Sequence, residues 1–378
     1  GLAAAGFEVR SEPGSGGKRE ITVARFAPRF LPRPGPRQHL LVDAGTADRT
    51  ERLPVAIVGG GLAGCALAGA LADAGWNTLL FERHPALAQE GSGNAAGVFH
   101  GVVHGQDGHH ARLHRAAAYA ARRAVADAIA GGSVRGSVDG LLRLAGREDD
   151  VVAMQALADR LALPADYVRP LPCDEAGRLA GVALAASAWH FPGGGWVEPS
   201  RLAEAHAGAA GPRLDLRCGR TVSSLRRVGE RWQLLDAGGD VLATAAIVVL
   251  ANGGAALDLL GGCALPLQAR RGQVSGVAAA SWPAASALRL PLAGSGYLLP
   301  PLDGTTWFGA SSSDHDTDPS LRGEDHAANV RRLAGLLAEP PSPESLGEVR
   351  GRVAWRWATA DRLPQIGPVP QSALGPAF

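Results

Sequence analysis

Residues 55–64 read VAIVGGGLAG, and this short stretch decides the fold of the chain. Its first four residues are apolar and bounded by glycine, which predicts a short buried strand; a helix is predicted to follow over 62–74. The glycines between them have the spacing G-x-G-x-x-G. In that pattern Gly59 permits a tight turn, Gly61 lets a pyrophosphate approach the backbone, and Gly64 lets the helix pack closely on the strand. Because the first amides of the helix attract phosphate, we predict a Rossmann-like dinucleotide-binding unit.

An acidic residue at the end of the next predicted strand supports this interpretation. That strand covers 77–81 and leads into Glu82, 18 residues after Gly64, where a carboxylate can bind both hydroxyls of a ribose. A carboxylate there favours a free 2′-hydroxyl and disfavours NADP, but it does not distinguish NAD from FAD. The alternative is a glycine-rich turn in a fold that binds no nucleotide.

Two later loops favour FAD. Residues 91–97 read GSGNAAG and can bring backbone amides, Ser92 and Asn94 to a diphosphate or a flavin ring. Residues 247–254 read IVVLANGG, a buried strand that ends in a turn. Each has a simpler explanation when taken alone: a flexible loop in the first case, a core strand and its turn in the second.

The remaining pattern predicts an α/β fold: a Rossmann-like FAD-binding domain with an inserted substrate domain built on a mostly antiparallel sheet. The predicted elements are helices over 111–130 and 322–337 and strands over 189–197, 214–225, 232–235, 297–299 and 306–310. Before residue 53 we predict a helix end over 2–5, two strands over 7–10 and 19–26 with a turn over 14–17, and a proline-rich linker over 27–52.

Composition limits the class of protein. Hydrophobic residues make up 46% and charged residues 19% of the 378, which allows a large core and excludes wholesale disorder. The net charge of +1 argues against a strong nonspecific nucleic-acid binder. A basic excess over 18–37 can contact RNA phosphates or serve as a solvated linker. Residues 53–72 carry no charge and are long enough to span a membrane, but their glycines favour strand, turn and helix.

Cysteines and histidines give no metal site. The four cysteines, which are Cys65, Cys173, Cys218 and Cys263, form no C-x-x-C pair, so we predict reduced and mostly buried thiols. Five histidines lie close together, at positions 100, 104, 109, 110 and 114. His100 and His104 have a helical ligand spacing, but glycines interrupt that segment, and we predict no bound metal.

Residues 53–378 resemble the D-amino-acid-oxidase and glycine-oxidase superfamily of FAD enzymes. Within it they most resemble the FAD-dependent half of the bifunctional enzymes that make 5-methylaminomethyl-2-thiouridine in tRNA. The segments that carry the resemblance are Gly59–Gly64, Glu82-Arg83, 91–97, Gly195-Trp196-Val197, Val249–Gly253, Gly272-Gln273-Val274, Gly296-Tyr297-Leu298, Gly309-Ala310-Ser311 and Asp361-Arg362-Leu363-Pro364. Residues 1–26 resemble the last two strands of the methyltransferase half.

The resemblance implies a reaction and a domain plan. FAD oxidises the carboxymethylaminomethyl group of uridine-34 in tRNA, and hydrolysis leaves aminomethyluridine and glyoxylate; the methyltransferase half then methylates the amine with S-adenosylmethionine. The implied FAD part covers 53–130, 196–262 and 356–378, the substrate part 131–195 and 263–355, and residues 1–26 are a methyltransferase remnant. We expect no methyl transfer by this chain. We also expect weak FAD binding or none, because the family's late glycine-rich segment does not follow Pro370.

The motifs and the resemblance together assign the site residues. The cofactor-binding set is Gly59, Gly61, Leu62, Ala63, Gly64, Glu82, Arg83, Ser92, Asn94, Val222, Asn252 and Gly253. Arg356 matches the family's carboxylate-binding arginine, and Tyr297 lines the pocket or orients the amine. The expected partner is tRNA, in the cytoplasm, with no membrane and no obligate protein partner. Two alternatives remain: an oxidase of small amines or amino acids, and a non-catalytic remnant that at most binds a nucleotide.

Overall fold

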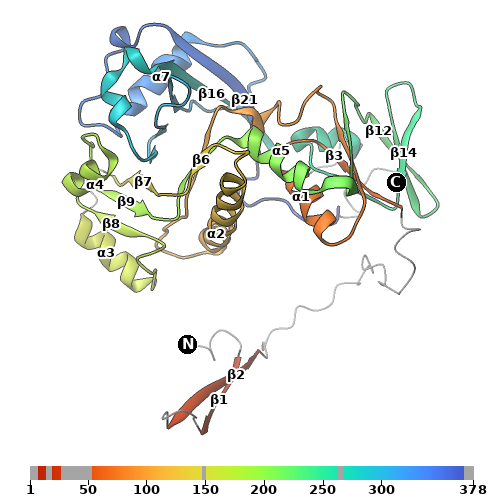
Figure 1. The fold of residues 1–378 in the computed structure, drawn as a ribbon, viewed down its shortest axis with the longest axis horizontal. Helices are drawn as coiled ribbons and strands as arrows, with labels where there is room; N and C mark the ends of the chain where they lie inside the picture. The colour runs from red at the N-terminus through yellow and green to blue at the C-terminus, as the bar shows by residue number, and fades with distance from the viewer. Residues whose placement is uncertain are drawn as a thin grey trace. The chain divides into compact units, whose positions relative to one another are not determined.

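The computed structural model describes residues 7–13, 19–26, 53–146, 150–261, 265 and 267–369, in two compact units divided after Arg52 (Figure 1). In the first unit, β1 (Phe7–Pro13) and β2 (Glu20–Phe26) pair in antiparallel register. Both strands are predicted from the sequence and are confirmed. The helix end over 2–5, the turn over 14–17, the linker over 27–52 and Cys263 lie outside the described residues.

A four-stranded parallel sheet forms the nucleotide-binding side of the second unit. Its strands, in spatial order, are β11 (Leu214–Cys218), β4 (Thr78–Glu82), β3 (Val55–Val58) and β15 (Ile247–Leu250). Helices α1 (Leu62–Asp73) and α5 (Pro199–Ala209) lie together on this sheet (Figure 1). The predicted strand, turn and helix over 55–74 are therefore confirmed. No helix among the described residues is long and apolar enough to cross a membrane.

A nine-stranded, mostly antiparallel sheet forms the other side, which confirms the predicted inserted sheet. The path runs β20 (Ser313–Asp314), β16 (Gln268–Ala278), β19 (Thr305–Gly309), β18 (Tyr297–Leu298), β17 (Leu292–Ala293), β7 (Leu141–Leu144), β9 (Ala188–Phe191) and β8 (Arg169–Leu171), and β21 (Val349–Ala358) also pairs with β16. The sequence analysis missed β16 and β21, the two longest strands of the sheet. The predicted domain boundary at residue 355 lies within β21.

Smaller elements complete the second unit. They are β5 (Gly97–Phe99), β6 (Gly136–Ser137), β10 (Gly195–Val197), β12 (Ser224–Val228), β13 (Arg231–Leu235), β14 (Val241–Ala245), α2 (His109–Ala130), α3 (Val151–Arg160), α4 (Cys173–Ala180), α6 (Ala256–Leu259) and α7 (Gly323–Leu333). The sequence analysis predicted neither α3 nor α4.

Two predicted strands are wrong as single elements. The stretch 189–197 divides into β9 and β10, which belong to different sheets, because Pro192, Gly193 and Gly194 turn the chain between them. The stretch 214–225 ends its first strand at Cys218, where Gly219 has φ +66°. The predicted helix over 322–337 ends at Leu333, just before Gly335.

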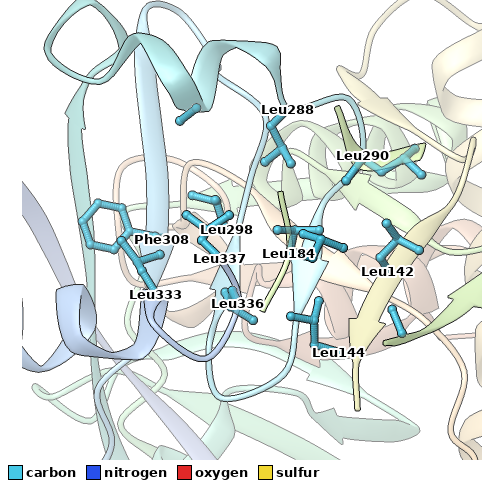
Figure 2. Close-up of a cluster of buried hydrophobic side chains, with 14 of the residues drawn as sticks. Leu142, Leu144, Leu184, Leu288, Leu290, Leu298, Phe308, Leu333, Leu336 and Leu337 are labelled. Carbon is cyan, nitrogen blue, oxygen red and sulfur yellow. The ribbon is translucent and has the colours of Figure 1, made fainter. Parts of the chain in front are cut away.

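A leucine-rich core lies between one face of the nine-stranded sheet and the helices α4 and α7 (Figure 2). Leu142, Leu298 and Phe308 from the strands and Leu333 from α7 are almost entirely buried. Because side chains alternate along a strand, Leu141, Phe191 and Ala293 lie on the opposite face of the sheet, where they form a second core with Tyr167 and Val168.

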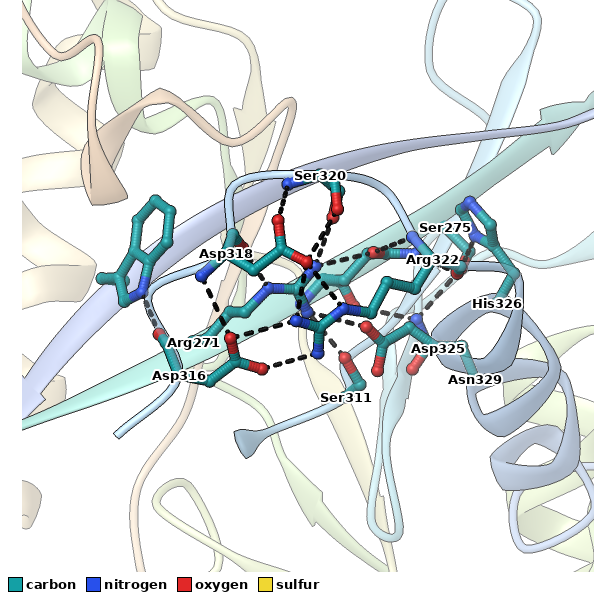
Figure 3. A network of polar contacts seen from close by, with 12 residues as sticks. Arg271, Ser275, Ser311, Asp316, Asp318, Ser320, Arg322, Asp325, His326 and Asn329 are labelled. Atoms are coloured by element: carbon teal, nitrogen blue, oxygen red, sulfur yellow. Dashed lines mark hydrogen bonds and ion pairs between the residues drawn. The ribbon is translucent and has the colours of Figure 1, made fainter. Parts of the chain in front are cut away.

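Beside this core, a buried arginine joins β16 to α7 (Figure 3). Arg271 is wholly buried, and its Nη1 lies 2.7 Å from Asp325 Oδ2. It also donates to Gln273 Oε1 and to the carbonyl oxygens of Asp318 and Ser320. A buried guanidinium needs such a full set of acceptors, because its desolvation is otherwise uncompensated.

We expect Asp325→Ala to destabilise the second unit strongly, because it leaves the Arg271 charge buried without its carboxylate. The expected loss is about 3–5 kcal/mol in the free energy of unfolding, measured as a fall in the thermal unfolding temperature. The matched control is Asp174→Ala, which breaks an exposed ion pair of 3.7 Å with Arg178 and is expected to cost less than about 1 kcal/mol. Equal effects of the two substitutions would contradict the structural role of Arg271.

Candidate functional site

The turn between β3 and α1 has the shape that a dinucleotide needs. Gly59 has φ +109°, and a Cβ there would lie 2.7 Å from the backbone of Ala251. A Cβ on Gly64 would lie 2.0 Å from Gly59 O, so the helix can approach the strand only with glycine at this position. Gly61, at the N-cap of α1, offers no side chain to the first amides of the helix. No side chain of the N-cap residue therefore covers these amides, as the motif predicts.

Glu82, at the end of β4, points toward this turn. Its carboxylate is 7% exposed; Oε2 accepts a hydrogen bond of 2.7 Å from Gly60 N, and Oε1 accepts one of 2.9 Å from His84 N. Each carboxylate oxygen can accept a further hydrogen bond. The acid is thus fixed beside the glycine turn, with acceptor capacity left for a ribose. Beneath the turn, burial foremost raises the pKa of the Cys65 thiol to about 12, so that it stays protonated.

The loop that includes η2 (Gly91–Gly93) closes over the N-terminus of α1. Ser92 Oγ accepts a hydrogen bond of 3.1 Å from Leu62 N. The amide of a residue at this place, the first of the helix, is also a typical donor to a bound phosphate oxygen. Asn94 lies on the same loop. Arg83 forms an ion pair with Glu90 at the start of the loop, and both side chains are about half exposed. The structure thus brings Ser92 to the first helical amide and engages Arg83 with the loop.

Arg352 of β21 holds this loop, and the sequence analysis missed it. Its Nη1 donates to Asn94 Oδ1 at 2.8 Å, and its Nη2 donates to the carbonyl oxygens of Gln89 and Glu90 at 2.7 and 2.6 Å. Burial lowers the pKa of Arg352, an effect that Glu90 partly offsets. The only signal in the sequence is its place four residues before Arg356, which matches the family's carboxylate-binding arginine.

A third turn, after β15, completes the crevice. A Cβ on Gly59 would lie 2.7 Å from Asn252 Cα, so the two turns touch. Gly253 has φ +60°, and Trp357 of β21 packs so closely that a Cβ on Gly254 would lie 2.0 Å from its ring. Asn252 Oδ1 is buried and has no hydrogen-bond partner among the described residues. A buried acceptor of this kind costs about 1–3 kcal/mol when left unsatisfied, so it fits a donor from a bound ligand.

Val222 lies in the core below the same crevice. It is 8% exposed and packs with Phe81 and Leu234. Its segment is joined to the end of β4, because Arg220 N donates to Glu82 O at 2.9 Å. The predicted cofactor residues from five separate segments therefore lie around the turn between β3 and α1, an arrangement that fits a dinucleotide such as FAD.

The predicted substrate residues both belong to the nine-stranded sheet, Tyr297 on β18 and Arg356 on β21. Burial raises the pKa of Tyr297, and the nearby Arg356 guanidinium partly offsets this rise. Arg356 is exposed, and it forms no ion pair within the described part of the chain. Residues 352 and 356 lie on the same face of β21, because side chains alternate along a strand. The strand that clamps the crevice loop through Arg352 therefore also carries Arg356.

The neighbouring histidines over 100–114 come from two different kinds of local structure. His100 and His104 precede α2 in a non-helical segment, so their spacing of four does not align them. His110 and His114 lie on α2 with ring centroids 4.3 Å apart. The described residues contain no group of three or more side chains suited to hold a metal ion.

We expect Gly64→Ala to abolish FAD binding, because its Cβ would lie 2.0 Å from the Gly59 carbonyl oxygen and would push α1 away from the turn. The matched control is Gly208→Ala in α5, where nothing lies within 4 Å of the added Cβ. The readout is the flavin released per chain on denaturation. Retention of flavin by Gly64→Ala, or its equal loss in both variants, would contradict this account.

Comparisons with known proteins agree with this geometry. The family model described as FAD dependent oxidoreductase matches residues 54–375. The protein named tRNA 5-methylaminomethyl-2-thiouridine biosynthesis bifunctional protein MnmC from Methylibium petroleiphilum is 43% identical over 98% of this chain and 56% of its own length. The protein of the same name from Burkholderia multivorans is 40% identical over the same shares. The chain thus spans about half the length of these curated relatives.

Solved structures agree as well. Glycine oxidase from Geobacillus kaustophilus superposes with a TM-score of 0.67 at 25% identity, over 85% of this chain and 86% of that one. L-proline dehydrogenase from P. horikoshii superposes with a TM-score of 0.70 at 15% identity over the same shares, which shows the common fold. FAD is the cofactor of the matched family. The chain therefore belongs to the FAD dependent oxidoreductase family, whose model covers nearly all of its second unit.

Proposed function

We propose that this chain oxidises the carboxymethylaminomethyl group of the wobble uridine, uridine-34, in tRNA. The observation that carries the proposal is the position of Arg356 on β21, the strand that Arg352 joins to the loop over the dinucleotide-binding turn. Tyr297 lies on β18 of the same sheet. The relatives named for tRNA 5-methylaminomethyl-2-thiouridine biosynthesis support the choice of substrate. The proposal places the protein in the cytoplasm, with its tRNA.

The reaction is an amine oxidation followed by hydrolysis. Bound FAD supplies a hydride acceptor for the carbon between the amine and the carboxylate. Loss of that hydride and of the amine proton leaves a carbon–nitrogen double bond. Water then adds to it, and the carbon–nitrogen bond breaks to give the aminomethyl group on uridine and free glyoxylate.

Arg356 is proposed to bind the substrate carboxylate. A guanidinium binds a carboxylate through two parallel hydrogen bonds, which fixes the direction of the neighbouring carbon as well as its position. Arg356 is available for this role, since within the described residues it has no acidic partner. Tyr297 stays protonated at neutral pH because burial raises its pKa, so we assign it a neutral hydroxyl that orients the amine rather than a general base.

The cofactor is proposed to lie along the crevice. Its diphosphate would contact the turn of Gly59, Gly61, Leu62, Ala63 and Gly64, together with Ser92. Glu82 would bind the ribose of the adenosine, near Val222. Asn252 and Gly253 would line the crevice beside Gly59. Arg83 and Asn94 would act by holding the loop, through Glu90 and Arg352.

A second candidate is an oxidase of free small amines or amino acids, favoured by the 25% identity with a glycine oxidase. The relatives are named bifunctional proteins, so methylation with S-adenosylmethionine is proposed for a part of the protein other than residues 53–378.

The deciding experiment mixes the flavin-loaded protein anaerobically with tRNA carrying the carboxymethylaminomethyl group. Bleaching of the flavin absorbance and release of one glyoxylate per tRNA are expected. Free glycine and sarcosine serve as competing substrates. Faster bleaching by these amines than by the tRNA would favour the small-molecule oxidase, and no bleaching by any of them would contradict both proposals.

We expect Arg356→Ala to lower kcat/KM for the tRNA by about 100-fold, because two charge-assisted hydrogen bonds to the carboxylate are lost. Arg356→Lys should retain part of the activity, since it keeps the charge without the two-pronged geometry. The matched control is Arg350→Ala, an exposed arginine on the same face of β21, which should change kcat/KM by less than about twofold. Equal losses of kcat/KM in Arg356→Ala and Arg350→Ala would contradict the proposed binding of the substrate carboxylate by Arg356.

A further inference from the structure

A groove beside the hairpin that carries Tyr297 is rich in arginine and has no assigned role. Its volume is about 500 Å³, and it is lined by Ser295, Ala328, Arg331, Arg332 and Gly335. Ser295 lies at the tip of the β17–β18 hairpin, and the two arginines lie in the last turn of α7. None of these lining residues is acidic. We propose that this groove binds the phosphate backbone of the tRNA next to the modified uridine, an inference that rests on the proposed function.

The charges in the groove are not neutralised by the protein. Arg331 and Arg332 form no ion pair with any carboxylate in the part of the chain that the structure describes. The other end of the same helix is different (Figure 3): Arg322 is bound by Asp316 and Asp318. An arginine already bound to a carboxylate has few donors left, whereas an unpaired one keeps its fork of N–H groups for an external anion.

The groove is in direct contact with the hairpin that carries Tyr297, a residue of the proposed substrate site. Ser295 Oγ donates a hydrogen bond of 2.9 Å to Arg332 O, which ties the hairpin tip to the end of α7. Tyr297 follows two residues after Ser295. A Cβ on the intervening Gly296 would lie 3.3 Å from Arg332 Cβ, so helix and hairpin are in contact along this path. A ligand bound at Arg332 would therefore lie beside Ser295 and Gly296, the two residues that directly precede Tyr297.

A further arginine lies on the other side of the hairpin. Ala293 pairs with Tyr297 in β18 and with Arg143 in β7, which places Tyr297 and Arg143 on one face of the sheet, about two strand spacings or 10 Å apart. Arg143 is exposed and, like the groove arginines, forms no ion pair among the described residues. The hairpin tip is thus flanked by unpaired arginines on both sides.

RNA is the partner whose chemistry fits this arrangement. A nucleotide in a tRNA loop has a phosphate on each side, so a base that enters a pocket draws two anions to the rim of that pocket. Arginine binds phosphate oxygens in the same two-pronged way as a carboxylate. Because the net charge of the chain is only +1, a local cluster of unpaired arginines is needed to place RNA at one surface.

The test compares the flavin-loaded wild type with the double variant Arg331→Ser/Arg332→Ser and the single variant Arg143→Ser. We expect the double variant to bind tRNA at least tenfold more weakly at low salt. The slope of log K against log salt should decrease by about 1.4, that is about 0.7 for each phosphate on a single strand. kcat/KM for the modified tRNA should fall in proportion, while turnover of any small amine and the flavin content stay unchanged. Arg143→Ser should reduce the slope by about half as much.

The control variant is Arg226→Ser/Arg227→Ser on β12, which removes the same two charges from exposed positions at the end of the unit away from α7 (Figure 1). The double lysine variant Arg331→Lys/Arg332→Lys, which keeps both charges, should show most of the wild-type salt dependence of tRNA binding. Thermal unfolding is measured for every variant to check that it is folded. Equal weakening by the β12 variant, or unchanged binding by the α7 variant, overturns this inference while the wild type still oxidises tRNA. If the wild type binds tRNA but produces no glyoxylate from it, the proposed function fails instead.

Discussion

The geometry of the site depends on the hydrogen bonds of Arg352. The dinucleotide crevice is built on a parallel sheet, and the proposed substrate residues are built on a different, antiparallel sheet. Arg352 belongs to the second sheet and holds the 89–94 loop of the first by one amide oxygen and two carbonyl oxygens. On the same strand, Trp357 packs on the turn after β15. One strand therefore contacts two of the turns around the predicted dinucleotide site and also carries Arg356, the proposed substrate-binding residue. In the proposed reaction this strand would hold cofactor and substrate at the short distance that hydride transfer requires.

Arginine serves several different purposes in this chain, and its surroundings decide which. Arg271 is wholly buried among acceptors and joins a strand to a helix. Arg352 is half-buried and holds a loop through neutral oxygens. Arg356, Arg331 and Arg332 lack acidic partners among the described residues. The guanidinium is the same in each case, so the number of acceptors that the protein supplies separates a structural arginine from one that is free to bind an external anion.

The sequence was most informative where structure is local. The strand, turn and helix over 55–74 and the position of Glu82 depend on spacing within about 30 residues, and both are found as predicted. The strands β16 and β21 escaped prediction for different reasons. Each is paired with a partner about 80 residues away, and β16 mixes arginine, glycine and polar residues without clear alternation. In β21 arginines at 350, 352 and 356 do alternate with apolar residues, a strand signal that the sequence analysis overlooked. The role of Arg352 escaped prediction because its partner Asn94 is 258 residues away. Pattern reasoning also joined β9 to β10, although the Pro-Gly-Gly between them sends the chain into a different sheet.

The order in which the strands appear has a consequence for how the protein is made. β3 is synthesised before its parallel partner β15, which lies almost 200 residues later, and the arginine that holds the loop over α1 comes about 100 residues after that. Until then the nascent chain exposes an unpaired strand edge, a condition that favours aggregation and slow folding. The loop over α1 is therefore held in place by Arg352 only after nearly all of the second unit has been synthesised. Flavin supply then stabilises the finished fold by mass action and does not guide its early assembly.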